Sequence, residues 1–431
     1  MICDNLSVRN GHLCFAGIDT TELAARYGTP LYLMDEDKIR EKCRLYKQAF
    51  AASFPEGSLP YYASKANSFK RLLEIVKEEG MGADVVSPGE IYTALQAGFD
   101  PEKLCFHGNN KTDADIAYAM DRRIGCFAVD NEEELRAMEA AAAERNIIQK
   151  IQLRITPGID THTYEEVNTG KVDSKFGNAI ETGQAEAITV LALSLPHIFL
   201  EGFHCHVGSQ VFEEDVFERS AVIMLRFMAD MRKKHGCETK VLNLGGGYGV
   251  PYVSQDKGIN IAEKTASVGA AIRSCCEELG MAVPEIHMEP GRSIVADAGM
   301  TLYHAGSLKR IPGYKNYVAI DGGIPDNPRY ALYRSAYTVY DASRMDEEAS
   351  LPCDVVGRCC ESGDIIQPNV CLPESVCRDD VIAVCTTGAY NYSMASHYNK
   401  IPKPAVVMLA GGKDYLAVRR ESIEDICRNE L

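Results

Sequence analysis

One lysine in this chain is well placed to do covalent chemistry. In YYASKANS, Lys65 comes directly after the short apolar run LPYYA, and Ser64, Asn67 and Ser68 lie around it. A strand end in a protein interior partly desolvates an amine, which lowers its pKa below about 10.4 and makes it more reactive towards an aldehyde. Lys65 could therefore hold an aldehyde cofactor, although most lysines at strand ends are simply solvated or ion-paired.

Two other segments offer groups for an anion and for a ring nitrogen. The glycines of LNLGGGYG allow backbone amides to come close to a phosphate. In EPGR, Glu289 could keep a ring nitrogen protonated, and the planar guanidinium of Arg292 suits a carboxylate or a phosphate. Each feature alone also fits a tight turn or a surface ion pair. A single aromatic cofactor with a phosphate tail would account for Lys65, His206, the glycines and Glu289 together.

Metal binding is the less favoured interpretation of the histidines and cysteines. In HCHV, His204 and His206 alternate and should share one strand face, but the sequence offers no third ligand at a suitable spacing. The 16 cysteines are scattered and lack a paired CxxC spacing, which is typical of reduced thiols in a reducing compartment. We expect no metal.

Short apolar runs alternate with longer amphipathic stretches from about residue 31, which predicts a (β/α)₈ TIM-like barrel. The expected strands are residues 59–64, 82–87, 103–108, 126–130, 151–155, 200–209, 241–249 and 285–292. Polar residues gather at their carboxyl ends, the end that carries the active site in such barrels. These residues are Lys65, Asp84, His107, Asp130, Arg154, His206, the glycines of GGGYG, Glu289 and Arg292.

The pattern changes after residue 297. Residues 298–431 contain short alternating runs broken by Gly, Pro and Asp, which predicts a second, mostly antiparallel β domain. The first 30 residues show the same pattern of short alternating runs. We therefore expect residues 1–30 to complete this domain and residues 31–297 to form the barrel.

Composition excludes several classes of partner. The chain has 45 basic and 61 acidic residues, a net charge of −16, and no run rich in lysine and arginine, which disfavours nucleic acids and anionic membranes. No apolar run reaches the length of a membrane span, and the start shows no secretory signal. We expect a cytoplasmic protein.

Eight motifs in order make the sequence resemble the diaminopimelate decarboxylase family. They are YYASKANS, HGNNKT, TGKVDSKFG, HCHVGSQ, LNLGGGYG, EPGRSIVADAG, CESGD and GAYNYSMASHYN. The resemblance extends from about residue 30 to 410. It implies a carboxy-lyase with an alanine-racemase-like barrel that uses pyridoxal 5'-phosphate to convert meso-2,6-diaminopimelate to L-lysine and CO₂.

The resemblance also implies roles for residues that hold the cofactor. Lys65 would bond to the cofactor aldehyde, His206 would stack on the ring, and Glu289 would pair with the pyridine nitrogen. The other residues expected to bind the cofactor are Asp84, Ser209, Gly246, Gly247, Gly291, Arg292 and Tyr390.

Further residues are expected to act on the substrate. Arg292, Arg329 and Tyr333 would bind the carboxylate at its distal end, and Tyr390 would also contact the substrate. In a head-to-tail homodimer with shared active sites, the neighbouring subunit would supply Cys360 as proton donor and Glu361 as a contact for the distal amine.

Two departures from the family pattern are visible. Tyr330 follows Arg329 where the family commonly has proline, and Cys359 precedes Cys360. The alternatives left open are a relative of the same fold acting on ornithine, arginine, carboxynorspermidine or a carrier-bound glutamyl group, a racemase, and a protein that binds the cofactor without catalysis. Arg329 and Glu361 favour a substrate whose far end carries both a carboxylate and an amine.

Overall fold

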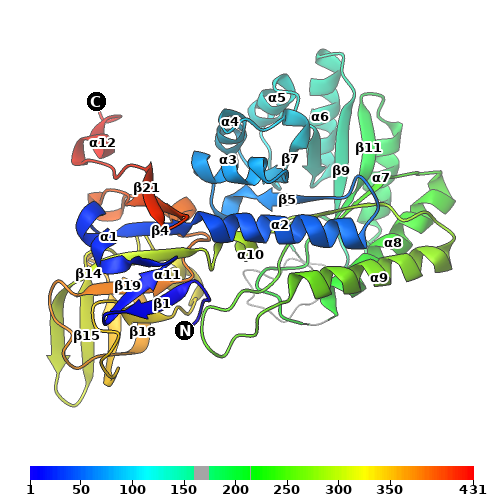
Figure 1. The fold of residues 1–431 in the computed structure, drawn as a ribbon. Coiled ribbons are helices and arrows are strands. Elements are labelled where there is room, and N and C mark those ends of the chain that lie inside the picture. Colours follow the sequence, from blue (N-terminus) through cyan, green and yellow to red (C-terminus); the bar gives the residue numbers. More distant parts are fainter. Residues whose placement is uncertain (160–173, 214) are drawn as a thin grey trace. The chain divides into compact units, whose positions relative to one another are not determined.

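A closed parallel barrel forms the larger of two compact units. The computed structural model describes residues 1–159, 174–213 and 215–431. Each of the eight predicted strand segments contributes one strand, and the sheet closes because β8 pairs with β9 and β13 pairs with β5. The strands are β5 (Leu59–Ala63), β6 (Gly82–Val85), β7 (Leu104–Phe106), β8 (Cys126–Val129), β9 (Gln149–Thr156), β11 (Ile198–His204), β12 (Val241–Asn243) and β13 (Glu285–Met288). The predicted barrel is confirmed (Figure 1).

Helices alternate with these strands. They are α3 (Lys70–Glu78), α4 (Pro88–Gln96), α5 (Asp113–Asp121), α6 (Glu132–Glu144), α7 (Gln184–Ser194), α8 (Val216–His235) and α9 (Ile261–Leu279). Helix α8 ends as its sequence predicts, because its last turn is basic and Gly236 takes the left-handed conformation, with φ of 66°. Figure 1 shows α8 and α9 side by side.

The smaller unit is a mostly antiparallel β domain. Its main sheet has the order β18-β17-β15-β14-β4-β20-β21, and β19 joins β14 to β16. The strands are β4 (Leu31–Asp35), β14 (Gly299–Ile311), β15 (Lys315–Ile320), β16 (Val339–Asp341), β17 (Leu351–Val356), β18 (Ile365–Leu372), β19 (Val381–Cys385), β20 (Ala405–Ala410) and β21 (Lys413–Val418). Two pairs among these strands are parallel, β15 with β17 and β4 with β20, and the other pairs are antiparallel.

The boundary between the units differs from the one expected. Strand β4 pairs with β14 and β20, so it belongs to the β domain although residue 31 was predicted to begin the barrel. The smaller unit comprises residues 1–41, 250–257 and 294–431, and the larger one residues 42–249 and 258–293. A short, fully buried apolar run such as LYLMD fits either kind of sheet, because its sequence lacks the alternation that would identify it.

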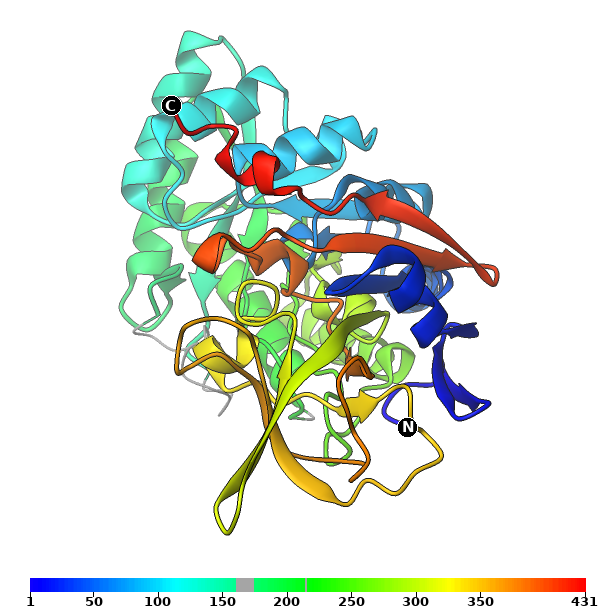
Figure 2. The same ribbon diagram turned by 90° about the vertical axis from the view of Figure 1, so that its left-hand side faces the viewer.

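The N-terminal segment packs on the β domain as a separate small sheet. Strands β1 (Leu6–Arg9), β2 (His12–Phe15) and β3 (Ile18–Asp19) form a separate small sheet. Leu13 donates its N–H to the Ala342 carbonyl at 2.9 Å, and Leu13 packs into the same apolar core as Leu302. Residues near both chain ends also meet in the main sheet, where β4 pairs in parallel with β20. Figure 2 shows the C-terminal strands of this sheet in red and orange-red.

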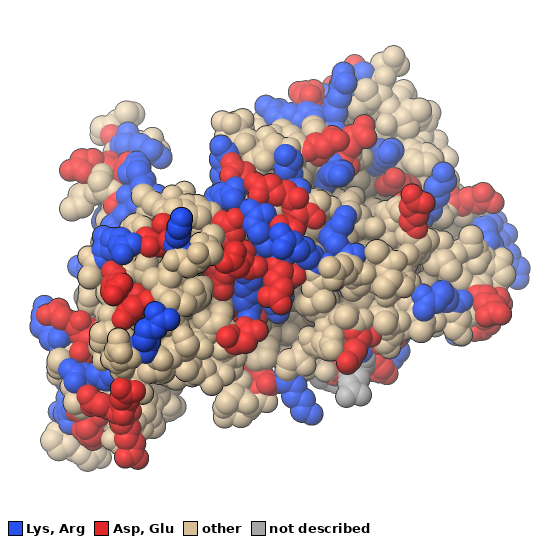
Figure 3. Space-filling model, viewed as in Figure 1, with Lys and Arg blue, Asp and Glu red and all other residues tan. Residues whose placement is uncertain are grey.

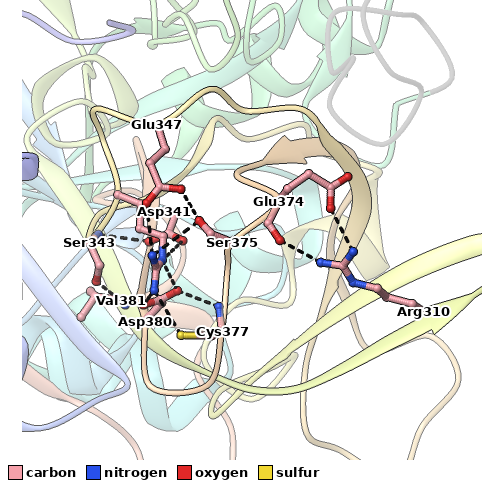
Figure 4. Close-up of polar contacts among 10 residues, drawn as sticks. Arg310, Asp341, Ser343, Glu347, Glu374, Ser375, Cys377, Asp380 and Val381 are labelled. Atoms are coloured by element: carbon pink, nitrogen blue, oxygen red, sulfur yellow. Dashed lines mark hydrogen bonds and ion pairs between the residues drawn. The ribbon is translucent and has the colours of Figure 1, made fainter.

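An arginine ties two loops of the β domain together. Arg344 lies 2.7 Å from Asp380 and 3.2 Å from Glu347, and it donates to the sulfur of Cys377 at 3.2 Å. Glu347 also accepts from the Ser375 hydroxyl, and Figure 4 shows these side chains converging. Because Asp341 is buried close to Asp380, burial and this neighbour raise the pKa of Asp341 to about 7.

Charged side chains of both signs are interspersed on the face shown in Figure 3. Within the described ranges, no helix combines the length and the apolar character needed to cross a bilayer.

Candidate functional site

Lys65 lies on a short turn immediately after β5. The turn is η1 (Ser64–Ala66), and the Ser64 hydroxyl donates to Glu90 at 2.7 Å while the Val86 amide donates to the same carboxylate oxygen at 2.8 Å. The sequence analysis expected the strand end to bury this lysine in part, whereas Lys65 is an exposed residue of the turn that follows the buried residues of β5. Glu90, which the sequence analysis missed, anchors this turn from α4.

Asp84 is buried close to charged groups at the strand ends. It is 1% exposed on β6, and neither of its carboxylate oxygens has a hydrogen-bond partner among the residues that the structure describes. Burial raises the pKa of Asp84, against the opposing positive charges of His107 and Lys65. An unsatisfied buried carboxylate is costly, so its position suits a ligand that brings a donor or a cation.

Glu289 is held by three side chains from other strand ends. Its Oε1 accepts from the Asn243 amide at 2.7 Å and lies 2.9 Å from His107 Nε2, and its Oε2 lies 3.2 Å from His204 Nε2. Although burial acts to raise it, His107 and His204 hold the pKa of Glu289 well below its usual value. Glu289 is therefore an ionised carboxylate inside the barrel.

The two histidines beside Glu289 differ in charge. Burial would lower the pKa of His107, but Asp84 and Glu289 together raise it well above its usual value. Burial lowers the pKa of His204 to about 4, so this ring is neutral at pH 7. The ligand atoms of His107, His204 and Glu289 lie within 4.8 Å of one another. Three ligand atoms at this spacing could bind a metal ion. In this structure, Glu289 instead contacts both histidines directly.

The sequence analysis expected His204 and His206 to share one strand face, and this expectation is wrong. Strand β11 ends at His204, and His206 follows in the loop, where its Nδ1 accepts the Gly246 N–H at 3.2 Å. Burial, reinforced by the positive charges of Lys65 and Arg154, holds the pKa of His206 well below its usual value. A neutral, planar imidazole results.

The glycine run after β12 makes close backbone contacts that exclude side chains. A Cβ on Gly246 would lie 2.2 Å from the Glu289 carbonyl oxygen, and one on Gly247 would lie 2.1 Å from the Gly208 carbonyl oxygen. Gly247 also has φ of 120°, which disfavours any residue with a side chain. A Cβ on Gly291 would lie 3.0 Å from the Ala63 carbonyl oxygen. These glycines bring the loops after β5, β11, β12 and β13 together.

Ser209 and Arg292 meet at this end of the barrel. The Arg292 guanidinium donates to the Ser209 hydroxyl at 3.2 Å, and Arg292 is only 8% exposed. A guanidinium, a hydroxyl and close-packed glycine amides form a donor set suited to a phosphate. The residues present therefore fit a cofactor with an aldehyde, a ring nitrogen and a phosphate.

The β domain brings three of the predicted substrate residues together. Arg329 is 7% exposed at the start of α11 (Arg329–Tyr333), and its guanidinium lies 4.7 Å from the Tyr333 ring centroid and 5.1 Å from that of Tyr390. Tyr330 does not disrupt this helix: it lies in the first turn, where proline would also be tolerated, and its carbonyl accepts the Arg334 N–H at 2.9 Å.

Cys360 and Glu361 lie on an exposed loop of the same unit. The Cys360 amide donates to the Asn399 side chain at 2.9 Å, and Glu361 accepts from the Gly363 amide at 3.0 Å. Cys359 differs from its neighbour, since it is half-buried and burial with the nearby Asp364 carboxylate raises its pKa to about 12. Of this pair, the exposed thiol is that of Cys360.

Other polar residues at strand ends have structural partners. The Gly177 amide donates to Asp130 at 3.0 Å, and the Arg154 guanidinium lies 4.4 Å from the Phe176 ring centroid. Residues 169–173, the first part of TGKVDSKFG, lie outside the described residues. Asn243 and His204 were missed as site residues, although a polar residue inside an otherwise apolar strand was a usable signal.

Comparison with known proteins identifies the class of protein. Residues 36–296 match the family described as pyridoxal-dependent decarboxylase, pyridoxal binding domain. The chain therefore carries the barrel of a pyridoxal-dependent decarboxylase.

Individual relatives identify the family within this class of decarboxylases. A diaminopimelate decarboxylase of Bacillus subtilis is 43% identical over 98% of this chain and 96% of its own length. The crystal structure of the M. jannaschii enzyme of that name superposes with a TM-score of 0.92 at 30% identity, covering 99% of this chain and 98% of that one. The Helicobacter pylori enzyme, crystallised with L-lysine, gives a TM-score of 0.87 at 33% identity over 96% and 99% of the two chains. The chain belongs to the diaminopimelate decarboxylase family.

Proposed function

We propose that this protein uses pyridoxal 5'-phosphate to decarboxylate meso-2,6-diaminopimelate to L-lysine and CO₂, the last step of lysine biosynthesis. The observation that carries the proposal is Glu289, an ionised carboxylate buried in the barrel and held by Asn243, His107 and His204. When bound, the cofactor ring withdraws the electron pair that loss of CO₂ leaves behind. An ionised Glu289 keeps the ring nitrogen protonated, which this chemistry requires.

The other cofactor-binding residues have complementary tasks. Lys65 bonds to the aldehyde, and the neutral His206 ring provides a flat surface for the pyridine. Ser209 and Arg292, bonded to each other at 3.2 Å, and the amides of Gly247 and Gly291 bind the phosphate, with Tyr390 as a further donor. Gly246 contributes by letting the loop come close to the Glu289 backbone, while its N–H orients the His206 ring. Asp84 contributes a buried negative charge near Lys65.

Specificity rests on groups for the distal end of the substrate. Arg329, whose guanidinium lies 4.7 Å from the Tyr333 ring centroid and 5.1 Å from that of Tyr390, binds the distal carboxylate, and Glu361 binds the distal amine. Ornithine has no second carboxylate to pair with Arg329. Cys360 donates a proton to the carbon that has lost CO₂, a role worth about 10² to 10⁴ in rate for a well-placed acid.

The proposal includes a homodimer in which the neighbouring subunit supplies Cys360 and Glu361. Both residues are exposed on a loop of the β domain. We also place the protein in the cytoplasm, where its 16 free cysteines would remain reduced.

Replacing the lysine tests the proposal. Lys65→Ala should lose the visible absorbance band of bound pyridoxal phosphate and release no lysine from meso-diaminopimelate. Lys70→Ala is the matched control, because Lys70 is also exposed and makes only a 3.6 Å ion pair with Glu74. A folded Lys65→Ala protein that kept both the band and full activity would contradict the proposal.

A further inference from the structure

One buried carboxylate connects two loops of the β domain that carry proposed substrate residues. Asp364, the last residue of CESGD, is 3% exposed. Its Oδ1 accepts the Ile324 N–H at 2.7 Å, and its Oδ2 accepts the Cys359 N–H at 2.7 Å. The two donors are 35 positions apart in sequence, so a single side chain fixes two separate segments.

Each of these segments leads directly to a proposed functional side chain. Residues 322–328 run into α11, whose first residue is Arg329. Residues 357–363 carry Cys360 and Glu361. A backbone bond of 2.9 Å from the Arg358 amide to the Gly322 carbonyl also joins the two loops.

The space around the Asp364 carboxylate is closed by glycines. A Cβ on Gly323 would lie 2.6 Å from both carboxylate oxygens, and a Cβ on Gly357 would lie 2.2 Å from Oδ2. Neither glycine has a left-handed φ, so the close approach of the carboxylate is the reason for glycine at these positions. The two loops are therefore shaped around this carboxylate.

The loop with Cys360 is ordered by further bonds although its side chains are exposed. The Gly357 amide donates to the Asp364 carbonyl at 2.9 Å, and the Asp364 amide donates to the Glu361 carbonyl at 3.1 Å. The Cys360 amide donates to Asn399 at 2.9 Å. Cys360 and Glu361 thus project from a backbone whose position is set inside the β domain itself.

We propose that Asp364 is a positioning residue for both active sites of the proposed homodimer: it fixes Cys360 and Glu361, which enter the neighbouring subunit's site, and the segment that leads to Arg329, which serves the site of its own chain. The inference rests on the proposed function for the roles of those three residues. Ionised carboxylates accept hydrogen bonds about twice as strong as neutral groups do, which suits one side chain that must hold two backbone amides. Catalysis is sensitive to displacements of about 1 Å, so loosening either loop should lower turnover.

Asp364→Asn removes at least one of the two bonds to the Ile324 and Cys359 amides. The asparagine side chain keeps one acceptor oxygen, but its NH₂ group would face the other backbone N–H. The two donors would repel each other in a space that the neighbouring glycines leave no wider. Asp354→Asn is the matched control. Asp354 is 1% exposed in the same domain and accepts the Asn369 amide at 3.0 Å, but its ion-pair partner is Lys315, outside both loops.

Hydrogen exchange read by mass spectrometry, without substrate, tests the connection. Peptides covering residues 322–328 and 357–363 should both exchange at least about tenfold faster in Asp364→Asn and at the wild-type rate in Asp354→Asn. Loss of protection in one segment only, or in neither, would overturn the proposal. If Asp364→Asn does not fold, native-state exchange of the wild type decides, because the Ile324 and Cys359 amides should open together with protection factors that agree within about threefold.

Kinetics and thiol labelling test the positioning role. In Asp364→Asn, KM for meso-diaminopimelate should rise and kcat should fall, together about 100-fold in kcat/KM, and the alkylation rate of Cys360 should change. Asp354→Asn should keep both kinetic constants. Unchanged kcat/KM in a variant whose two loops both exchange faster would refute positioning. Absence of CO₂ release by the wild type would instead refute the proposed function, while the exchange result still decides whether Asp364 connects the loops.

Discussion

The charge of Glu289 is the feature whose removal should have the most specific effect. Glu289→Gln keeps the shape of the side chain and an oxygen that can accept from Asn243, but it removes the negative charge that lies 2.9 Å from His107 Nε2. Two unit charges at that separation attract each other by about 6 kcal/mol at an effective dielectric constant of about 20. Asp84, at 4.0 Å from the same nitrogen, retains an attraction of about 4 kcal/mol.

Two measurements follow from this loss. The pKa of His107, held above its usual value by Asp84 and Glu289, should fall in Glu289→Gln, which NMR titration of the imidazole can detect in the protein without cofactor. In the loaded protein, kcat should fall by about 100-fold or more, the size seen when one electrostatic stabiliser is removed, while KM changes little.

A matched control separates this effect from general damage to the barrel. Glu134→Gln makes the same change at another buried carboxylate of the barrel, which lies 2.7 Å from Lys111 Nζ. It should lower thermal stability by about 3 kcal/mol or more, because it leaves Lys111 buried without its charged partner, and should leave kcat and the pKa of His107 unchanged. An unchanged His107 titration in Glu289→Gln, or full activity of that variant, would refute the reasoning.

Three further predictions concern the glycines, the proton-donor loop and the pH dependence of stability. Gly247→Ala should weaken pyridoxal phosphate binding at least about tenfold in a fluorescence titration, because its Cβ would lie 2.1 Å from the Gly208 carbonyl oxygen; unaltered affinity would count against the phosphate site. Asn399→Gly should speed exchange of the Cys360 amide, which loses its 2.9 Å acceptor, while the left-handed φ of 53° remains accessible; the same exchange rate as in the wild type would show that this bond is unimportant. Asp341 has a pKa of about 7 in the folded protein and about 3.9 when unfolded, so its contribution to stability is complete below pH 4 and is lost as pH rises through 7. Asp341→Asn should therefore be more stable than the wild type by up to about 4 kcal/mol at pH 8, and a variant that gains nothing there in urea unfolding would contradict the assignment.

Local sequence patterns were sufficient to predict the barrel. The alternation of apolar runs and amphipathic helices located all eight strands, since each βα unit carries its own periodic signal. The same patterns misplaced the start of the barrel, because the five residues of β4 are buried on both faces and their partners β14 and β20 lie far away in sequence.

The contacts that tune the site could not be predicted in this way. The bond from Asn243 to Glu289 and the ion pair between His107 and Glu289 depend on which strand ends meet when the barrel closes. Asp364 and Ile324 are likewise joined only by the folding of the β domain. Resemblance to a family supplied roles for Lys65 and Glu289, whereas the charge states of their neighbours required the three-dimensional structure.

A substrate panel tests the central claim most directly. Purified wild-type protein with pyridoxal 5'-phosphate would be given the meso, LL and DD forms of diaminopimelate, ornithine and arginine, and CO₂ and amine products would be quantified. The account predicts equimolar CO₂ and L-lysine from the meso form and little or no release from ornithine or arginine. Release from ornithine without release from meso-diaminopimelate would contradict it.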